Sequence, residues 1–228
     1  MTNNIKDVFF DLDHTLWDFE KNSALTFQKI FEVNQLQIDL DVFLNAYIPI
    51  NEDYWKRFRT GEVDKEALRF GRLNDTFEYL KTPVKADLIY KLSDDYLAYL
   101  SSFNHLFPDT TLVLGYLQTK YNLHIITNGF DEVQYSKLTG SNINQYFKTV
   151  TNSEEAGVKK PHPDIFKYAL QKANAEVNTS VMIGDNLEAD ILGAINVGFK
   201  AIYFNETPLT TYPEITQIDK LIELKNFL

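Results

Sequence analysis

Cysteine is absent from the 228-residue chain, which excludes disulfides, thiolate metal sites and cysteine nucleophiles. Glycine (9) and proline (7) are scarce while Phe (17) and Tyr (13) are plentiful, a balance typical of a folded chain. Positive charge is also scarce, because 22 Lys and Arg stand against 32 Asp and Glu, a net charge of −10. Such a surface repels phosphate backbones, so we expect no nucleic acid polymer as a partner.

Long apolar runs are missing as well, so we expect no membrane association. Residues 1–7 do not combine a basic region with an apolar run, and we therefore expect no signal peptide and a cytoplasmic location. We expect a monomer or a weak homodimer. The length suits one domain with a sizeable insert, or two small domains.

Short apolar runs alternate with helical patterns over most of the chain, which predicts an α/β fold with a parallel sheet and helices on both faces. The expected strands lie near residues 8–10, 123–127, 147–150, 181–183 and 200–204. A closing helix is expected over 218–228. Residues 20–103 are helical in pattern, and Pro49 is expected to end or kink one of these helices. We therefore predict a core of residues 1–15 and 104–228 with an inserted α-helical domain, 16–103.

Polar residues follow several of the expected strands. Asp11 and Asp13 follow the first strand, Thr127 ends the second, and Gly184-Asp185 follows a later one. Ligands of open α/β sheets bind at the carboxyl ends of strands, so these side chains are expected to converge on one site.

Asp11 and Asp13 are spaced so that both could reach one ligand. Two close carboxylates raise each other's pKa unless a cation lies between them, and Mg²⁺ accepts carboxylate oxygens and bridges to phosphate. One Asp could then attack phosphorus while the other moves a proton. In the alternative interpretation, one acid caps the following turn and the other is solvated.

The other candidates are weaker one by one. Thr127-Asn128-Gly129 could hold phosphate oxygens, or it is an ordinary turn. Lys160 precedes Pro161 and could offset phosphoryl charge, or it is a solvated lysine. Asp185 stands at a strand tip, and Asp190 could face the same site one turn later.

These motifs together resemble those of the haloacid-dehalogenase-type (HAD) phosphohydrolases: Asp11-Leu12-Asp13-His14-Thr15, Thr127, Lys160-Pro161, and Gly184-Asp185 through Asp190. The resemblance spans nearly the whole chain. It implies a Rossmann-like core with a helical cap, and hydrolysis of phosphate monoesters through an aspartyl-phosphate.

Each matching position receives a role from this resemblance. It makes Asp11 the nucleophile, Asp13 the acid and base, and Thr127 with Asn128 the binders of the phosphoryl group. Lys160 would steady Asp11 and the phosphoryl oxygens. The Mg²⁺ ligands would be Asp11, the Asp13 main-chain carbonyl and Asp185, with Asp190 in support. His14 occupies a variable position and is expected to make only a local turn contact.

The chain resembles the pyrimidine 5′-nucleotidases of this family more specifically, through Ile126-Thr127-Asn128-Gly129-Phe130, the run from Asn51 to Gly61, Arg69-Phe70, and Asp190-Ile191-Leu192-Gly193-Ala194. The substrate implied is a small phosphorylated metabolite, a nucleoside monophosphate. Aromatic side chains that could stack on its base are Trp17, Phe19, Tyr54 and Trp55, although rings at helical spacing usually mark a core. Three arginines could meet an anionic substrate or pair with acids: Arg57, Arg69 and Arg72.

Four other functions stay open. A phosphatase for a sugar phosphate or phosphoglycolate would share every core motif. A dehalogenase would need neither Mg²⁺ nor the second carboxylate. A receiver-like phospho-aspartate signalling domain would need no helical insert. A catalytically silent binding protein would not need intact motifs.

Overall fold

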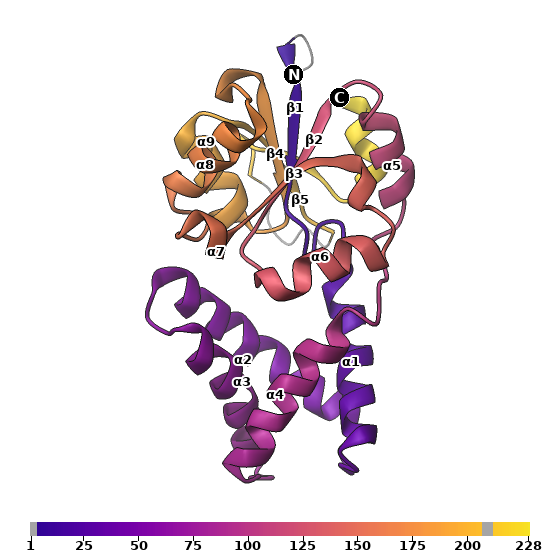
Figure 1. The fold of residues 1–228 in the computed structure, drawn as a ribbon, viewed down its shortest axis with the longest axis vertical. Coiled ribbons are helices and arrows are strands. Elements are labelled where there is room, and N and C mark those ends of the chain that lie inside the picture. Colours follow the sequence, from indigo (N-terminus) through magenta and orange to yellow (C-terminus); the bar gives the residue numbers. More distant parts are fainter. Residues whose placement is uncertain (1–3, 207–211) are drawn as a thin grey trace. The chain divides into compact units, whose positions relative to one another are not determined.

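The computed structural model describes residues 4–206 and 212–228. They form two compact units (Figure 1). One unit contains the described residues up to Phe19 together with those from Asn104 onward, and the other is Glu20–Phe103. Residues 16–19, which the sequence pattern placed at the start of the insert, therefore lie in the unit that contains the sheet.

A six-stranded parallel sheet organises the first unit, in the order β3-β2-β1-β4-β5-β6. Its strands are β1 (Asp7–Phe10), β2 (Asn122–Thr127), β3 (Phe147–Asn152), β4 (Ser180–Gly184), β5 (Lys200–Phe204) and β6 (Thr216–Ile218). The chain runs outward from β1 on one side and then crosses to β4 on the other. β1 and β4 therefore flank the point where the strand order reverses, which is where ligands bind in such sheets.

Helical segments connect these strands: α5 (Thr110–Leu117), α6 (Asp131–Gly140), η2 (Asn144–Tyr146), α7 (Ser153–Ala156), α8 (Pro163–Ala173), η3 (Val177–Thr179), the π-helical η4 (Leu187–Leu192), α9 (Gly193–Val197) and η5 (Leu221–Asn226). In Figure 1, α8 and α9 lie on one side of the sheet and α5 on the other. The predicted class, an α/β fold with a Rossmann-like parallel sheet and a helical insert, is confirmed.

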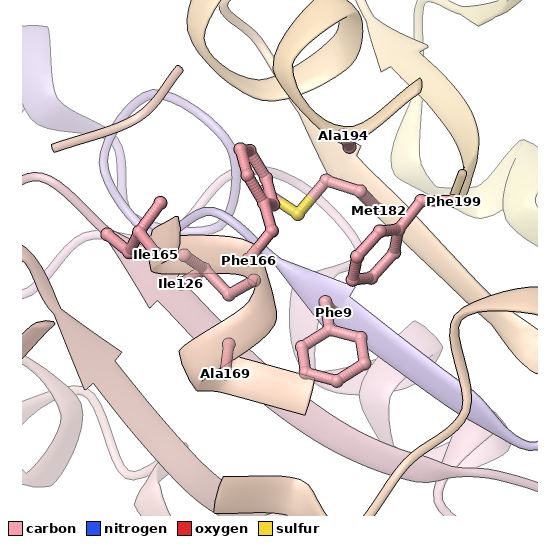
Figure 2. Close-up of a cluster of buried hydrophobic side chains, with 8 residues drawn as sticks. All are labelled: Phe9, Ile126, Ile165, Phe166, Ala169, Met182, Ala194 and Phe199. Carbon is pink, nitrogen blue, oxygen red and sulfur yellow. The ribbon is translucent and has the colours of Figure 1, made fainter. Parts of the chain in front are cut away.

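The core under α8 and α9 shows why the strands are apolar throughout. Phe9, Ile126 and Met182 come from three neighbouring strands and are fully buried (Figure 2). They pack with residues of α8 and α9 and with the residue that precedes β5: Ile165, Phe166, Ala169, Ala194 and Phe199. Alternate strand residues such as Phe10 point to the opposite face and are buried too, as expected for a sheet covered on both sides.

Four helices make the second unit: α1 (Phe19–Val33), α2 (Leu40–Thr60), α3 (Lys65–Tyr79) and α4 (Ala86–Leu100). Asp39 and Asp64 cap α2 and α3 by accepting hydrogen bonds from Val42 N and Ala67 N. The interior is rich in aromatic rings, and Phe27 lies within 4.9 Å, centroid to centroid, of Phe43, Tyr47 and Tyr96. The predicted helical character of this segment is confirmed.

Two local expectations differ from the structure, a helix end at Pro49 and a closing helix over 218–228. Helix α2 does not end at Pro49 but continues to Thr60, where Gly61, with φ 78°, closes it by donating its N–H to carbonyls of the last turn. The closing helix expected over 218–228 is replaced by β6 and the 3₁₀ segment η5. Residues 216–218 pair with β5, which satisfies their backbone and shortens the helical segment. Among the described residues we find no helix with the length and apolarity needed to cross a bilayer.

Candidate active site

Strand register brings the predicted motifs to one edge of the sheet. Phe10, the last residue of β1, lies between Ile125 of β2 and Ile183 of β4. The next residue, Asp11, continues this line by donating its N–H to the Ile183 carbonyl at 2.8 Å. The residues that end or follow the three strands therefore meet at the carboxyl edge, as the sequence predicted.

Lys160 lies at the centre of this edge, and its side chain is only 2% exposed. Its Nζ donates to Asp11 Oδ1 at 2.6 Å and to the Ile126 carbonyl at 2.7 Å, and it pairs with Asp190 Oδ1 at 2.6 Å. Burial would lower the pKa of Lys160, but the attraction of Asp11 and Asp190 outweighs it and the pKa is raised. The ammonium is therefore retained, and the interpretation of Lys160 as a solvated lysine is wrong.

Three carboxylates lie close together at this edge of the sheet, and Lys160 contacts two of them. Asp11, Asp185 and Asp190 each place an oxygen within 4.8 Å of the others. Burial raises the pKa of Asp11 well above its usual range, and the repulsion of Asp190 and Asp185 adds to this against the opposing effect of Lys160. Burial and then Asp190 raise the pKa of Asp185 to about 7. One lysine does not compensate three acids, so the cluster is short of positive charge.

This donor set fits a divalent cation. Carboxylate oxygens are the preferred protein ligands of Mg²⁺, and a bound cation would remove the repulsion that raises both pKa values. Thr15 supports the cluster by donating its hydroxyl to Asp185 Oδ1 at 3.1 Å.

Asp190 is held in the cluster by the irregular turn that follows β4. The π-helical η4 begins after Asn186, whose side chain accepts from Ala189 N, while Asp190 Oδ2 accepts from Asn186 N at 3.0 Å. Gly184 is required here because a Cβ would collide with the Asp190 carboxylate. π-turns of this kind are frequent at functional sites. Asp190 therefore lies in the carboxylate cluster and pairs directly with Lys160.

The Thr127-Asn128-Gly129 turn orients two groups, the Thr127 hydroxyl and the backbone of Lys160. Gly129 donates its N–H to Thr127 Oγ1 at 3.0 Å, which leaves the Thr127 hydroxyl proton for another acceptor. The Asn128 side chain makes two hydrogen bonds to the backbone of Lys160. Its Oδ1 accepts from Lys160 N at 2.8 Å, and its Nδ2 donates to Lys160 O at 2.9 Å. The side chain of Asn128 thus fixes Lys160.

Asp13 lies outside the carboxylate cluster. Its Oδ1 accepts from Lys137 Nζ at 2.6 Å and its Oδ2 from Gln134 Nε2 at 3.4 Å, both residues of α6. Neither side chain was expected from the sequence. The sequence does contain a signal for these two residues, because Gln134 and Lys137 share the buried face of α6 with Val133 and Leu138. Polar residues on the buried face of a helix need a partner.

His14, the three arginines and two of the aromatic candidates make local or packing contacts, whereas Trp55 is partly exposed. His14 has φ 64° and donates its N–H to the Trp17 carbonyl, which is the expected turn contact. Trp17 and Tyr54 are buried, as core rings are. Arg57 and Arg69 pair with Asp53 and Asp94, and Arg72 is buried and donates to Asn51. Trp55 is partly exposed and packs edge-on against Phe58.

Comparison with known proteins agrees with the site. Residues 5–198 match the haloacid dehalogenase-like hydrolases, and the chain belongs to this family.

Individual relatives with high coverage are phosphatases with different substrates. The chain is 30% identical to pyrimidine 5′-nucleotidase YjjG of Escherichia coli, over 97% of this chain and 96% of that one. It is 33% identical to a glyceraldehyde 3-phosphate phosphatase of Pyrococcus abyssi, over 88% of this chain and 81% of that one.

The crystal structure of the putative HAD-hydrolase YfnB from Bacillus subtilis, bound to magnesium, matches with a TM-score of 0.90. The sequence identity is 26%, and 99% of each chain is covered. This chain is therefore a HAD phosphatase, and its relatives act on different phosphate esters.

The carboxylate cluster gives a stability prediction for Asp185→Asn. A carboxyl whose pKa is raised by folding, from 3.8 to about 7, destabilises the folded state increasingly as pH rises between these values and fully above pH 7. In EDTA at pH 8, we expect the variant to be more stable than wild type by about 1 kcal/mol, or about 2–4 °C. The gain should shrink toward pH 4.

Added Mg²⁺ should reverse this order. Mg²⁺ at 100 times its Kd stabilises the wild type by about 2.7 kcal/mol, and Asp185→Asn should lose most of that gain. Glu188→Gln, which removes an exposed carboxylate of the same turn, is the matched control and should respond to Mg²⁺ like wild type. Thermal unfolding followed by circular dichroism measures all three proteins. An equal Mg²⁺ response in Asp185→Asn would exclude Asp185 as a ligand.

Proposed function

We propose that this HAD phosphatase is a Mg²⁺-dependent 5′-nucleotidase that hydrolyses pyrimidine nucleoside monophosphates through an aspartyl-phosphate. The observation that carries the chemistry is the buried Asp11 carboxylate, fixed by Lys160 at the carboxyl end of β1 and facing Asp185 and Asp190. A nucleophile needs a fixed orientation and a compensated charge; Lys160 supplies the orientation and part of the compensation, and Mg²⁺ would supply the rest.

The reaction divides between the two acids of the first motif. Lys160 binds Asp11 Oδ1, so Asp11 Oδ2 attacks phosphorus while the P–O bond to the leaving group breaks. Asp13 enters this step as the neutral acid, with its proton on Oδ2 while Oδ1 keeps the hydrogen bond from Lys137, and it gives that proton to the leaving oxygen. Asp13, now a carboxylate, removes a proton from water, and the resulting hydroxide attacks the phosphorus of the aspartyl-phosphate. Inorganic phosphate leaves and Asp11 is regenerated.

The remaining residues bind and orient. Thr127 donates its hydroxyl proton to a phosphoryl oxygen, and Lys160 stabilises the charge on phosphoryl oxygens as well as on Asp11. Asn128 contributes to phosphoryl binding through the lysine that its side chain holds. Asp11, the Asp13 main-chain carbonyl and Asp185 would hold Mg²⁺ with Asp190 in support, and the cation would neutralise the carboxylates and the phosphoryl group.

The rival functions differ in what they need from these residues. A dehalogenase needs no cluster of three acids beside its nucleophile, and a receiver-like domain needs no helical unit after β1. A silent binding protein has no need for an activated Asp11. A sugar-phosphate phosphatase remains the second candidate, because the Pyrococcus relative is a glyceraldehyde 3-phosphate phosphatase.

Two observations support the nucleotidase assignment, the similarity to the E. coli relative and one side chain of the helical unit. The similarity to the E. coli pyrimidine 5′-nucleotidase extends over nearly the full length of both chains, including the helical unit. In that unit Trp55 keeps part of its ring exposed. A stacked base contributes about 1–3 kcal/mol, enough to discriminate between leaving groups that share a phosphoryl group.

Replacing the nucleophile tests the covalent step. Asp11→Asn should form no phosphoenzyme and reduce turnover to background, because an amide oxygen does not displace the ester. Acid quenching followed by mass spectrometry should show a phosphorylated wild type and an unmodified variant. Asp164→Asn, an exposed acid of α8, is the control and should behave like wild type. Substantial turnover by Asp11→Asn would contradict the mechanism.

Replacing the proton carrier should give a defect that depends on the leaving group. Asp13→Asn should lower kcat by about 10²–10⁴-fold with phenyl phosphate. The loss should be much smaller for phosphoenzyme formation from p-nitrophenyl phosphate, whose leaving group needs little protonation. Stopped-flow measurement of nitrophenolate release separates this step from hydrolysis. Equal losses with both substrates would remove Asp13 from the proton transfer.

A substrate screen decides between the nucleotidase and its rival. In the presence of Mg²⁺, uridine 5′-monophosphate should have a higher kcat/KM than purine monophosphates and glyceraldehyde 3-phosphate, and EDTA should abolish all turnover. Trp55→Ala should reduce kcat/KM for uridine 5′-monophosphate by roughly 5–150-fold and leave p-nitrophenyl phosphate nearly unaffected.

Tyr79→Ala removes an exposed ring of the same helical unit and serves as the control. If Trp55→Ala lowers both substrates together with the melting temperature, Trp55 is a packing residue. If glyceraldehyde 3-phosphate exceeds every nucleotide, the nucleotidase assignment fails while the phosphatase stands.

A further inference from the structure

A second buried lysine lies beside the candidate acid and base. The Lys137 side chain is 2% exposed, and its Nζ donates to Asp13 Oδ1 at 2.6 Å. Aromatic rings close the space around the ammonium, with the Trp17 centroid at 4.4 Å and the Phe19 centroid at 5.4 Å. Burying an ammonium is costly unless it is paired, and Asp13 is the carboxylate that pairs with it.

The pair is unequally exposed. The Asp13 side chain is 19% exposed, about ten times the fraction of Lys137. The lysine therefore approaches the carboxylate from the protein interior, and part of the carboxylate faces outward. A lysine has four rotatable side-chain bonds, and packing against Trp17 and Phe19 restricts them. The ammonium is consequently a fixed point to which Asp13 is bound.

Gln134 binds the other oxygen of the same carboxylate. Its Nε2 lies 3.4 Å from Asp13 Oδ2, one helical turn before Lys137 on α6. Gly129 makes room for this side chain, because a Cβ at Gly129 would overlap the Gln134 amide and lie 3.2 Å from Asp13 Oδ2. With both oxygens bound from one helix, the plane of the carboxylate is set.

A purely structural role does not explain Lys137. Apolar residues of similar volume usually fill a buried position at least as well as an ion pair does. Lys137 instead brings a cation to a partly exposed carboxylate two residues after Asp11. Proton transfer requires the carboxyl within hydrogen-bond reach of the reacting oxygen, and small misplacements are costly to the rate.

We propose that Lys137 is a positioning residue that, with Gln134, holds the Asp13 carboxylate in the orientation needed for proton transfer to the leaving group. The inference rests on the proposed function, in which Asp13 carries that proton. α6 follows directly on the Thr127-Asn128-Gly129 turn, so a single segment orients the phosphoryl-binding hydroxyl and the proton carrier.

The test is a double-mutant cycle between Lys137→Met and Asp13→Asn with two substrates and Mg²⁺. Lys137→Met should lower kcat for phenyl phosphate by about 10–100-fold, because the carboxylate loses its fixed orientation. With p-nitrophenyl phosphate the rate of phosphoenzyme formation should change by no more than about threefold, and KM should change little for either substrate. In the Asp13→Asn background, Lys137→Met should cause no further loss beyond about threefold.

Lys120→Met is the matched control. Lys120 also lies over an aromatic ring, 4.1 Å from the Tyr116 centroid, but it is exposed and outside the site. This variant should keep both activities. If Lys137→Met does not fold, Lys137→Gln replaces it, since this side chain also lacks the cation and is too short to reproduce the contact. The same difference between the two substrates is then expected.

The outcomes separate the two levels of the argument. If Asp13→Asn lowers phenyl phosphate hydrolysis but Lys137→Met does not, the positioning role is wrong and the proposed function stands. If Lys137→Met lowers both substrates equally, or lowers the Asp13→Asn variant by the same factor as wild type, Lys137 acts on structure alone and the inference is overturned. If Asp13→Asn itself keeps full activity, the role of Asp13 fails and the inference fails with it.

Discussion

The buried ammonium of Lys160 is the contact on which the carboxyl edge of the sheet depends. It binds Asp11, Asp190 and the Ile126 carbonyl, and so joins β1, η4 and β2 at one atom. Contacts from neighbouring segments hold Lys160 and its partners in place. The Asn128 amide fixes the Lys160 backbone, and the π-helical turn of η4 delivers Asp190. Without this ammonium, Asp11 and Asp190 would lose the lysine that pairs with both of them.

A cluster of three acids and one lysine has an excess of negative charge, and a further bound cation would reduce the repulsion among the acids. Removing repulsion by protonation and removing it by binding a metal compete with each other, because both act on the same oxygens. The raised pKa values of Asp11 and Asp185 express this shortage of positive charge. The site is therefore prepared for a divalent cation by its electrostatics as well as by its ligand types.

Sequence reasoning found what depends on residue type and strand ends. Asp11, Thr127 and Asp185 could be predicted because each ends or follows an expected strand, and parallel strands end at one edge. Lys160 was found instead from its place before Pro161 and from the family resemblance. Sequence reasoning placed Asp190 near the site but missed the π-helical turn of η4 that holds it there, and it missed the strand in the segment after β5. Helix α2 passes through Pro49 because tertiary packing of its aromatic face overrides the local preference.

The residues around Asp13 escaped prediction for a different reason. A lysine and a glutamine in a helix are usually solvated, and only the helical period places Gln134 and Lys137 on the buried face beside Val133 and Leu138. Once buried, their polar groups need partners that lie more than a hundred residues earlier in the chain. Such long-range pairing has no signal in local spacing, and its only sequence trace is a polar residue where an apolar one is expected.

The two acids of the first motif thus receive different lysines and different surroundings. Asp11 is buried and shares Lys160 with Asp190, whereas Asp13 is partly exposed and is bound by Lys137 from the interior. Pairs of acids placed in contrasting environments are how one site assigns separate roles to chemically identical groups. Asp11 and Asp13 are only two residues apart in sequence. Asp11 belongs to the cluster that is short of positive charge, whereas Asp13 forms an ion pair with Lys137. In the mechanism that we propose, that separation keeps Asp11 as the nucleophile while Asp13 exchanges protons with the leaving group and with water.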